Sequence, residues 1–363
     1  MVSTRFERIT LGPNDDGRRL DRIVRKALPR VPLSRIYRAL RSREIRLNGS
    51  RARADTRVHE GDLLEVAATV RDAAIREDTS AGRAPRAGGA ASGGTQPAAA
   101  RPEVVLETDH LLVVVKDAGE LTHGEDSLET RVRDYLRARL APGVSFRPGP
   151  VHRLDRNTSG LVVFAASLRG AREASRALKE GALLKRYVAL LEGDLRPAPG
   201  TRRTGTEQAS GEESGHELVW RDSLQRNRSE RTTRRARHSD AGKRSGADQP
   251  PRGKEAVSRV EPVAWTGELT LALVRIETGR THQIRAQCEL HGHPLAGDRK
   301  YGATSRGPYL LHAGSLTATP DAGELGFHHL WMPPPERFEQ RIAHEFGLAA
   351  VDRLRERLAS PPR

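Results

Sequence analysis

Hydrophobic and polar positions along the chain form three patterned blocks, separated by two stretches without periodicity. The patterned blocks cover residues 13–67, 103–195 and 254–350. Residues 69–101 consist mainly of Ala, Gly, Arg and Pro and cannot bury enough apolar surface to offset chain entropy, so they are predicted to be a flexible linker. Residues 197–252 are polar and highly charged, and are predicted to be an exposed, partly disordered insertion.

The first block has the spacing of two short helices followed by two strands. Apolar residues recur at helical spacing over residues 20–27, before two prolines that end the helix. Ser34 is predicted to be the N-cap of a second, arginine-rich helix. Residues 45–47 predict a strand that enters a tight turn at residues 48–49, and residues 63–66 predict the second strand of a short hairpin. Together these elements predict a small α/β domain with one positive face.

The second and third blocks mix strand and helix patterns without a regular βαβ alternation. The predicted strands cover residues 104–107, 111–116, 161–166, 186–192 and 269–276, and the predicted helices cover residues 129–140, 172–184 and 281–291. Strands outnumber helices, and they do not alternate with them. This order favours an α+β domain built on a mixed, mainly antiparallel sheet.

The charge balance points to a polyanionic partner. The chain has 363 residues, and its 62 Lys and Arg exceed its 47 Asp and Glu, which gives a formal net charge of +15. Such an excess is typical of proteins that bind nucleic acid. The alternative is a generally basic proteome in which arginine is common on protein surfaces.

Several classes of protein are excluded by what the sequence lacks. No run of about 18 apolar residues is present, so no membrane-spanning helix is expected. The N-terminal residues lack an apolar stretch, so no secretory signal is expected. The single cysteine, Cys288, excludes an internal disulfide framework and any multi-cysteine metal site, and is interpreted as a small core residue. These absences predict a cytoplasmic protein.

The segment 149–160, GPVHRLDRNTSG, is the strongest candidate for a reactive site. It is a polar loop directly before an apolar strand, which is where reactive groups are commonly placed. Asp155 lies among Arg153, Arg156 and His152, and nearby cations favour the ionised form of a carboxylate. An ionised carboxylate can act as a nucleophile or a base. The alternative is a structural Arg–Asp loop that closes a sheet edge.

Two further segments carry histidine and arginine. Residues 277–285, ETGRTHQIR, follow a predicted strand and open a helix, so that His282 and Arg285 lie about one turn apart. Such a helix start suits an anion such as phosphate, although a plain helix cap with solvated arginines is the alternative. His291 and His293 could join His282 in a metal site, but their spacing matches no familiar zinc pattern and no metal is predicted.

Taken together, these segments resemble the signature motifs of the RluA-type (large-subunit-type) pseudouridine synthases. HRLD at 152–155 followed by RNTSGL resembles the central motif, KRY at 185–187 resembles the second, and GRTHQIR at 279–285 with GHPLAGD at 292–298 resembles the third. The first block resembles the alpha-L RNA-binding domain, first recognised in a small-subunit ribosomal protein. The resemblance covers most of the chain outside the linker and the insertion. It implies an RNA-binding domain over residues 13–68 and a catalytic domain over residues 102–350.

The resemblance also implies a reaction. A uridine in RNA would lose its N1–C1′ glycosidic bond, and the uracil would turn and reattach through C5, with no cofactor or metal. Asp155 would be the nucleophile, attacking C1′ or removing the 2′ proton. Tyr187 would pack against the base, with a possible part in removing the C5 proton, and Arg285 would pair with Asp155. Arg153 would enter the RNA stack as the target nucleotide flips out.

Further binding residues follow from the same resemblance. Ile284 and Leu311 would line the uracil pocket, and the remaining substrate-binding candidates are His152, Arg280, His282 and Gln283. The candidates for RNA binding in the first domain are Arg35, Arg38, Arg41, Arg43, Arg46 and Asn48. The expected partner is RNA, with large-subunit ribosomal RNA favoured by the appended domain and transfer RNA as the alternative. The protein is expected to be a monomer.

Two departures from the family pattern change the expectations. In the strand motif LLVVVKDAG, Val115 stands where the family shows Asn or Asp, and Asp117 stands where it shows Pro. This predicts a changed loop and an intact fold. The insertion 197–252 is longer than expected, and it either contacts RNA or is inert.

Two other functions compete with the leading one: a non-catalytic RNA-binding assembly factor, and a metal-dependent hydrolase using His282, His291 and His293.

Overall fold

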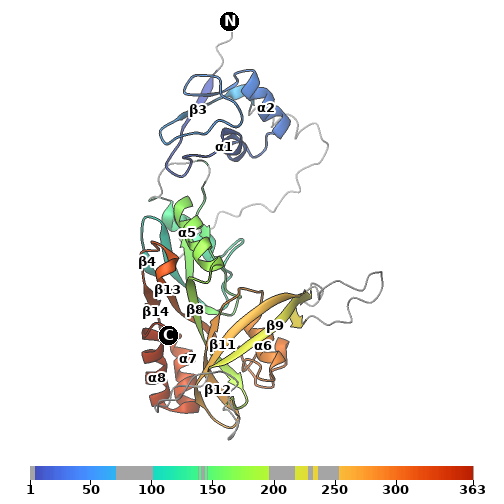
Figure 1. Cartoon of the computed structure of the whole chain (residues 1–363), viewed down its shortest axis with the longest axis vertical. Coiled ribbons are helices and arrows are strands. Elements are labelled where there is room, and N and C mark those ends of the chain that lie inside the picture. Colours follow the sequence, from blue (N-terminus) through green and yellow to red (C-terminus); the bar gives the residue numbers. More distant parts are fainter. Residues whose placement is uncertain are drawn as a thin grey trace, which may run out of the picture. The chain divides into compact units, whose positions relative to one another are not determined.

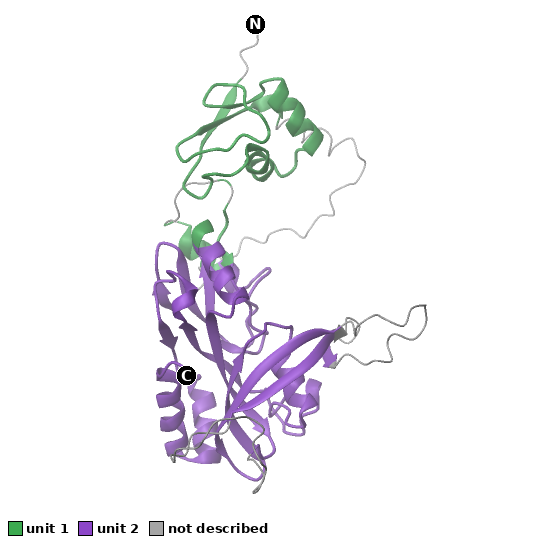
Figure 2. Ribbon diagram, in the orientation of Figure 1, with its two compact units in different colours: residues 1–101, 131–149, 166–169 green, residues 102–130, 150–165, 170–363 purple. Residues whose placement is uncertain are grey.

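The computed structural model forms two compact units (Figure 2). It describes residues 5–70, 101–137, 139, 144, 146–195, 217–227, 232–235 and 253–362. Unit 1 comprises residues 1–101, 131–149 and 166–169, and unit 2 comprises residues 102–130, 150–165 and 170–363. The predicted linker lies almost entirely outside the described residues. The predicted insertion is described only at residues 217–227 and 232–235.

Unit 1 contains two helices packed on a small sheet. Its elements are β1 (Phe6–Thr10), α1 (Leu20–Ala27), α2 (Leu33–Arg41), β2 (Ile45–Leu47) and β3 (Leu63–Ala67). The strands run antiparallel in the order β1-β3-β2. Leu20, Ile23 and Val24 of α1 and Ile36 of α2 are fully buried, as their helical spacing predicts.

Two details of unit 1 differ from the sequence-based expectation. Ser34 is not the N-cap of α2, because the helix begins at Leu33 after Pro32, whose φ of −56° already suits a helix entry. Asn48 and Gly49 do form a tight turn, with φ angles of 52° and 75°. That turn joins Leu47 to Ser50 and does not connect β2 to β3, so it is not the turn of the predicted hairpin.

Unit 2 is built on an eleven-stranded sheet (Figure 1). Its strands are β4 (Val104–Glu107), β5 (Leu111–Lys116), β6 (Gly149–Pro150), β7 (Ser159–Ala165), β8 (Leu183–Glu192), β9 (Leu218–Asn227), β10 (Thr232–Arg235), β11 (Lys254–Trp265), β12 (Leu269–Ile276), β13 (Leu311–Ala318) and β14 (His329–Trp331). The order is β10-β9-β11-β12-β8-β13-β7-β5-β4, with β14 on β13 and β6 on β7. Only β13 and β7 run parallel along this path. The predicted mixed, mainly antiparallel sheet is therefore confirmed.

Helices cover parts of this sheet. They are α5 (Leu168–Lys179), α6 (Gln283–Leu290), α7 (Glu336–Phe346) and α8 (Leu348–Ala359), with short 3₁₀ turns at Arg299–Tyr301 and Pro320–Ala322. Helix α4 (Leu128–Leu136) begins in unit 2 and ends in unit 1. Buried residues of α7 and α8 pack against Val188 and Leu190 of β8 (Figure 1). Cys288 of α6, the one cysteine of the chain, is fully buried. No helix among the described residues is long and apolar enough to cross a membrane.

Several predicted boundaries were wrong for identifiable reasons. The helix predicted over residues 172–184 ends at Lys179, because Gly181 adopts a φ of 74° and the chain turns into β8. The helix predicted over residues 129–140 ends at Leu136. Strand β11 was not predicted, and its Pro262 sits at a β-bulge, where proline is tolerated. Helix α8 runs past the expected domain boundary at residue 350.

Candidate active site

A cavity of about 670 Å³ lies on one face of the unit 2 sheet. Strand β8 shows which face: Val188 and Leu190 pack toward α7 and α8, whereas Lys185 and Tyr187, of the opposite parity, line the cavity. The cavity brings together all three residues expected to be catalytic, Asp155, Tyr187 and Arg285. It is also lined by all the expected substrate-binding residues, which are His152, Arg153, Arg280, His282, Gln283, Ile284 and Leu311.

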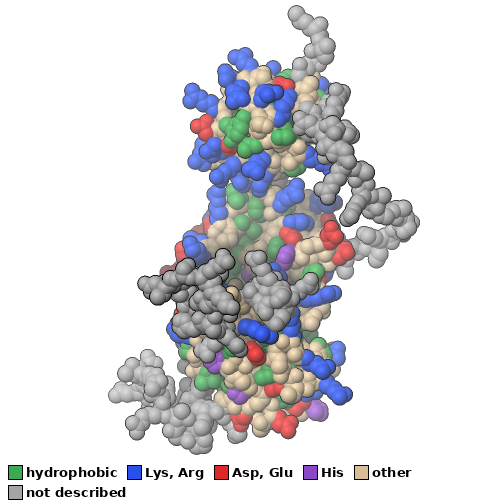
Figure 3. Space-filling model, turned by 90° about the vertical axis from the view of Figure 1, so that its right-hand side faces the viewer, with side chains coloured by type: hydrophobic (Ala, Val, Ile, Leu, Met, Phe, Trp, Pro, Cys, Tyr) green, Lys and Arg blue, Asp and Glu red, His purple; other side chains and the backbone are tan. Residues whose placement is uncertain are grey.

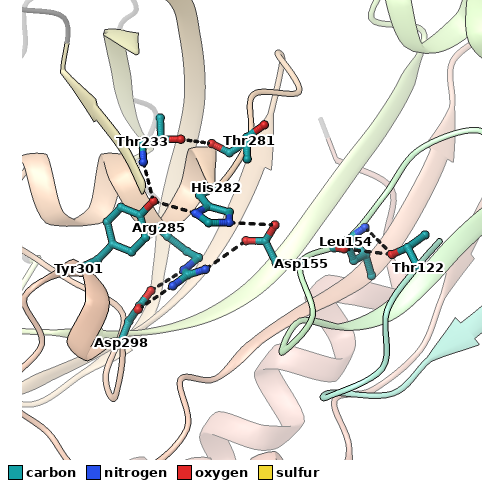
Figure 4. Close-up of polar contacts among 9 residues, drawn as sticks. All are labelled: Thr122, Leu154, Asp155, Thr233, Thr281, His282, Arg285, Asp298 and Tyr301. Carbon is teal, nitrogen blue, oxygen red and sulfur yellow. Dashed lines mark hydrogen bonds and ion pairs between the residues drawn. The ribbon is translucent and has the colours of Figure 1, made fainter. Parts of the chain in front are cut away.

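The loop that carries Asp155 is fixed by buried polar contacts on both sides. The ammonium of Lys116, at the end of β5, donates to the backbone carbonyls of Asp117, Arg156 and Thr158 at 2.6, 3.0 and 2.8 Å. The Thr122 hydroxyl donates to the carbonyl of Leu154 at 3.0 Å and accepts its N–H at 3.2 Å (Figure 4). Replacing this buried lysine would leave three backbone carbonyls without a hydrogen-bond donor, which costs folding free energy. Asp155 is therefore presented from a rigid loop.

Asp155 faces two cationic or polar side chains from the segment around α6. Its Oδ2 lies 3.5 Å from Nη1 of Arg285, and its Oδ1 lies 3.9 Å from Nε2 of His282 (Figure 4). The Asp155 side chain is 19% exposed, so it is accessible from the cavity while largely shielded. His282 directly precedes α6 with a left-handed φ of 52°, a conformation of the kind found at functional sites.

Arg285 is held in place by an acidic partner and two aromatic rings. Its Nε and Nη2 donate to Asp298 at 2.6 and 2.9 Å, which is a buried, bidentate ion pair. The guanidinium carbon lies 4.7 Å from the ring centroid of Tyr301 and 4.6 Å from that of Tyr309. Burial raises the pKa of Tyr309 to about 12, against the effect of the nearby Arg285 charge, so its ring stays neutral.

Strand β8 contributes a tyrosine and a lysine to the cavity wall. Tyr187 is 5% exposed, and burial together with the charge of Asp155 raises the pKa of its phenol. Burial lowers the pKa of Lys185 to about 8. Arg186, between them, points to the other face, where its Nε donates to the Ser315 hydroxyl at 3.1 Å. The KRY motif thus divides its side chains between the two faces of the sheet.

His152 and Gln283 line the cavity, and each accepts hydrogen bonds from within the protein. The Nε2 of His152 accepts the Val163 N–H at 3.2 Å, and burial, aided by the Lys185 charge, lowers the imidazole pKa to about 3. Gln283 donates to the Val257 carbonyl and the Ser258 hydroxyl, and its oxygen accepts from Thr278 and from the N–H of Arg280. The amide of Gln283 therefore shapes the segment before α6.

The three histidines of the metal hypothesis do not converge. His282 faces Asp155. His291 stacks on Trp220 and lies 3.0 Å from Asp222, and His293 Nδ1 lies 2.9 Å from the carbonyl of Glu192. Within the described part of the chain, no group of three potential metal-ligating side chains is found.

The six residues expected to bind RNA in unit 1 fall into two classes. Arg38, Arg41 and Arg43 are exposed. The other three make contacts within the unit: Arg35 pairs with Glu44 at 2.7 Å, Arg46 lies over the ring of Phe6, and Asn48 bonds to Asp62 and Leu63. Figure 3 shows Lys and Arg side chains gathered on the surface that unit 1 forms.

Sequence reasoning missed several residues that shape the site. Asp298 appears only as the last residue of a motif, and like Tyr301, Tyr309 and Lys185 it was given no role of its own. Thr233, in the predicted insertion, contacts Tyr301 and Thr281, and nothing in the local sequence indicates it.

Comparison with known proteins places the chain in a family. Residues 110–290 match the family model described as RNA pseudouridylate synthase, and residues 18–64 match that of the S4 domain. The ribosomal large subunit pseudouridine synthase C of Salmonella typhi is 32% identical over 309 residues, covering 85% of this chain and 83% of that protein. The protein of the same name from Escherichia coli K12 is 31% identical over 331 residues, covering 87% and 90%.

A solved structure agrees on the fold. Human RNA Pseudouridylate Synthase Domain Containing 1 superposes with a TM-score of 0.50 at 21% identity, covering 74% of this chain and 99% of that chain. The identity and coverage of the Salmonella protein, together with the match to the family model, decide the assignment. The chain belongs to the RNA pseudouridylate synthase family, whose members are isomerases.

Proposed function

We propose that this protein converts uridines of large-subunit ribosomal RNA to pseudouridine, with Asp155 as the reacting carboxylate. Two kinds of support are independent of each other. Relatives that match most of this chain carry the name ribosomal large subunit pseudouridine synthase C, and the S4 match supplies an RNA-binding unit. The single observation that carries the proposal is the cavity in which Asp155, Arg285 and Tyr187 converge.

The chemistry of the cavity walls suits a flipped-out uridine. Tyr187, Ile284 and Leu311 offer apolar surface against which a uracil ring packs, and Asp155 offers a carboxylate to the sugar. The reaction begins with Asp155, which either attacks C1′ and forms an ester as the N1–C1′ bond breaks, or removes the 2′ proton as the uracil leaves. The freed uracil anion turns and its C5 bonds to C1′, while the ester bond breaks or the 2′ carbon regains its proton. The C5 proton then leaves, and N1 takes up a proton. The raised pKa of Tyr187 keeps its phenol protonated, which favours a packing role over that of a base.

Cations around the cavity suit the phosphates that flank the target. Arg153 is exposed beside Asp155, a position from which it enters the space vacated in the RNA stack. Lys179, Lys185 and Arg280 also line the cavity. Exposed arginines of unit 1 add affinity for the RNA backbone without dictating the sequence.

The test is a map of pseudouridines in total RNA from cells with and without the gene, using carbodiimide modification and reverse-transcription stops. The expected result is the loss of one or a few stops in large-subunit RNA. Purified protein should restore them on an unmodified transcript. Asp155→Asn should abolish this isomerisation while retaining RNA binding, and Asp134→Asn, on the exposed face of α4, is the matched control.

Other outcomes would redirect the proposal. Loss confined to transfer RNA would keep the chemistry and overturn the substrate. Turnover retained by Asp155→Asn would overturn the role of the carboxylate. No isomerisation of any transcript by the wild-type protein would favour a non-catalytic RNA-binding role.

A further inference from the structure

A chain of polar contacts, two hydrogen bonds and one longer ion-pair contact, runs from strand β10 to the carboxylate of Asp155 (Figure 4). The backbone N–H of Thr233 donates to the phenol oxygen of Tyr301 at 2.9 Å. The same phenol oxygen lies 2.8 Å from Nδ1 of His282. On the other side of the imidazole, Nε2 lies 3.9 Å from Oδ1 of Asp155.

We propose that Tyr301, held by the Thr233 backbone, fixes the proton of His282 on Nε2, so that His282 acts as a positioning residue for Asp155. The proposal rests on the proposed function, in which Asp155 is the reacting group. His282 is the second nitrogen-bearing neighbour of Asp155, beside Arg285, and the proposal gives it a defined role. It also makes part of the predicted insertion a support of the active site.

The direction of each hydrogen bond in this series follows from which groups can donate and which can accept. A backbone N–H can only donate, so the phenol oxygen of Tyr301 accepts from Thr233 and keeps its own proton for another acceptor. The nearest nitrogen, Nδ1 of His282, is such an acceptor when the imidazole is neutral. Its remaining proton then resides on Nε2, directed toward Asp155.

The opposite tautomer is disfavoured by charge. With the proton on Nδ1, the lone pair of Nε2 would face a carboxylate oxygen at 3.9 Å. A doubly protonated imidazole is also disfavoured, because burial lowers the pKa of His282 and the nearby Arg285 opposes a further positive charge, although the Asp155 charge acts in the opposite sense. The N–H on Nε2 is therefore the arrangement that suits both sides of the ring.

The two oxygens of Asp155 then face two different donors. Oδ1 faces Nε2 of His282 and Oδ2 faces Nη1 of Arg285. One donor for each oxygen defines the plane of the carboxylate, which a single ion pair does not. The contact of 3.9 Å is longer than a hydrogen bond, and a small movement on substrate binding brings it into range.

Strand β10 is well suited to hold Tyr301 and His282 in this arrangement. It pairs with β9 at the sheet edge, from Thr232 opposite Asn227 to Arg235 opposite Leu224. The Thr233 hydroxyl donates to the carbonyl of Thr281, the residue before His282, at 2.8 Å. Thr233 therefore fixes both Tyr301 and the backbone that carries His282. This role differs from the two weighed for the insertion, which were RNA contact and inertness.

The test combines a spectroscopic signature with a double-mutant cycle on the full chain. Long-range ¹H–¹⁵N spectra of ¹⁵N-histidine protein report the tautomer, and among the 13 histidines the signal of His282 is assigned by its loss in His282→Gln. The expected wild-type signature is protonated Nε2 and bare Nδ1. In Tyr301→Phe, which keeps the ring against Arg285 but removes the phenol, this signature should broaden or change.

Single-turnover isomerisation gives the second readout. Tyr301→Phe should lower the rate on the order of tenfold with little change in RNA affinity. The amide introduced by His282→Gln is an N–H donor whatever Tyr301 donates, because it has no tautomer to be fixed. This variant should therefore retain more activity than His282→Ala. In the His282→Gln background, Tyr301→Phe should change the rate by less than about twofold.

Two outcomes would overturn the inference. A wild-type signature with the proton on Nδ1 contradicts it directly and needs no variant to fold. An equal effect of Tyr301→Phe in the wild-type and His282→Gln backgrounds shows that Tyr301 does not act through His282. Failure of the proposed function is distinguishable, because it shows as turnover by Asp155→Asn or as no isomerisation by wild type, whatever the tautomer.

Discussion

Arg285 donates two hydrogen bonds to Asp298 through Nε and Nη2, and this leaves Nη1 for Asp155. The contacts to Asp298 are 2.6 and 2.9 Å, whereas the contact to Asp155 is 3.5 Å. The guanidinium is thus anchored by one carboxylate and presented to another. Such an arrangement fixes the position of the cation without tying up the reacting group.

Replacement of Asp298 by Asn should therefore impair both stability and catalysis. The buried guanidinium would lose its closest counter-charge, which costs roughly 3–5 kcal/mol of unfolding free energy when a buried pair is broken. Arg285 would move toward Asp155, and the tighter pair would make the carboxylate less reactive. Chemical denaturation and single-turnover rates measure the two effects, with Asp134→Asn as the control. Unchanged values in both assays would contradict the anchoring role.

The exposed arginines of unit 1 should set the salt dependence of RNA binding. Each phosphate contact contributes about 0.7–0.9 to the slope of log affinity against log salt, so replacing Arg38, Arg41 and Arg43 by Gln should flatten that slope by up to about 2 to 3. The measurement is RNA affinity at several salt concentrations. A matched triple replacement on α7 and α8, Arg341, Arg355 and Arg357 to Gln, should leave the slope unchanged. Equal slopes for all three proteins would exclude Arg38, Arg41 and Arg43 from the RNA-binding surface.

Lys185 should react with amine reagents at a lower pH than an ordinary lysine. Burial lowers its pKa to about 8, and the neutral amine is the reactive form, so labelling should reach half its maximum near pH 8. In the unfolded chain the midpoint should rise to about 10.4. Between these values the unfolded state binds more protons, so this group makes the folded state more stable as the pH rises.

Mass spectrometry of the labelled protein measures this profile site by site. Bound RNA should suppress the labelling of Lys185, because this lysine lines the cavity. Lys254, exposed on β11 and outside the cavity lining, is the internal reference for the reagent. A profile of Lys185 that coincides with that of Lys254, with and without RNA, contradicts the prediction.

Gly160 should not tolerate a side chain. Its φ is +116°, and a Cβ built on it would lie 2.3 Å from the carbonyl oxygen of Ala313. This close approach belongs to the parallel pairing of β7 with β13, directly after the loop of Asp155. Gly160→Ala should lower the thermal unfolding temperature by several degrees and reduce activity. Gly267→Ala, which meets nothing within 4 Å, is the control, and similar unfolding temperatures for the two variants would show that β13 yields to the added atom.

The convergence of Asp155, Tyr187 and Arg285 in one cavity was predicted from the resemblance of their three motifs to those of one family. Taken singly, each motif also fits a structural role, so local pattern alone did not predict that the three side chains meet. The alternation of Lys185, Arg186 and Tyr187 on β8 follows from strand geometry. Local patterns could not predict partners that are distant in sequence.

Asp298 and Thr233 illustrate that limit. Gly-Asp at residues 297–298 has the composition of a turn, and its pairing with Arg285 depends on how the chain returns after α6. Thr233 holds Tyr301 through its backbone N–H, which carries no sequence signal. Strand β13 was missed because its sequence, LHAGSLTA, is neither an alternating pattern nor a continuous apolar run, although all eight of its residues are buried.

The burial of Cys288 has a practical consequence. It is the one cysteine of the chain, it is fully shielded in α6, and burial raises the pKa of its thiol. Thiol-directed dyes should therefore leave the native protein unlabelled. A cysteine introduced at an exposed position outside the predicted RNA-binding residues, such as Arg51, becomes a unique attachment point for a fluorophore. The encounter between this enzyme and its RNA can then be followed in real time, without first removing a native thiol.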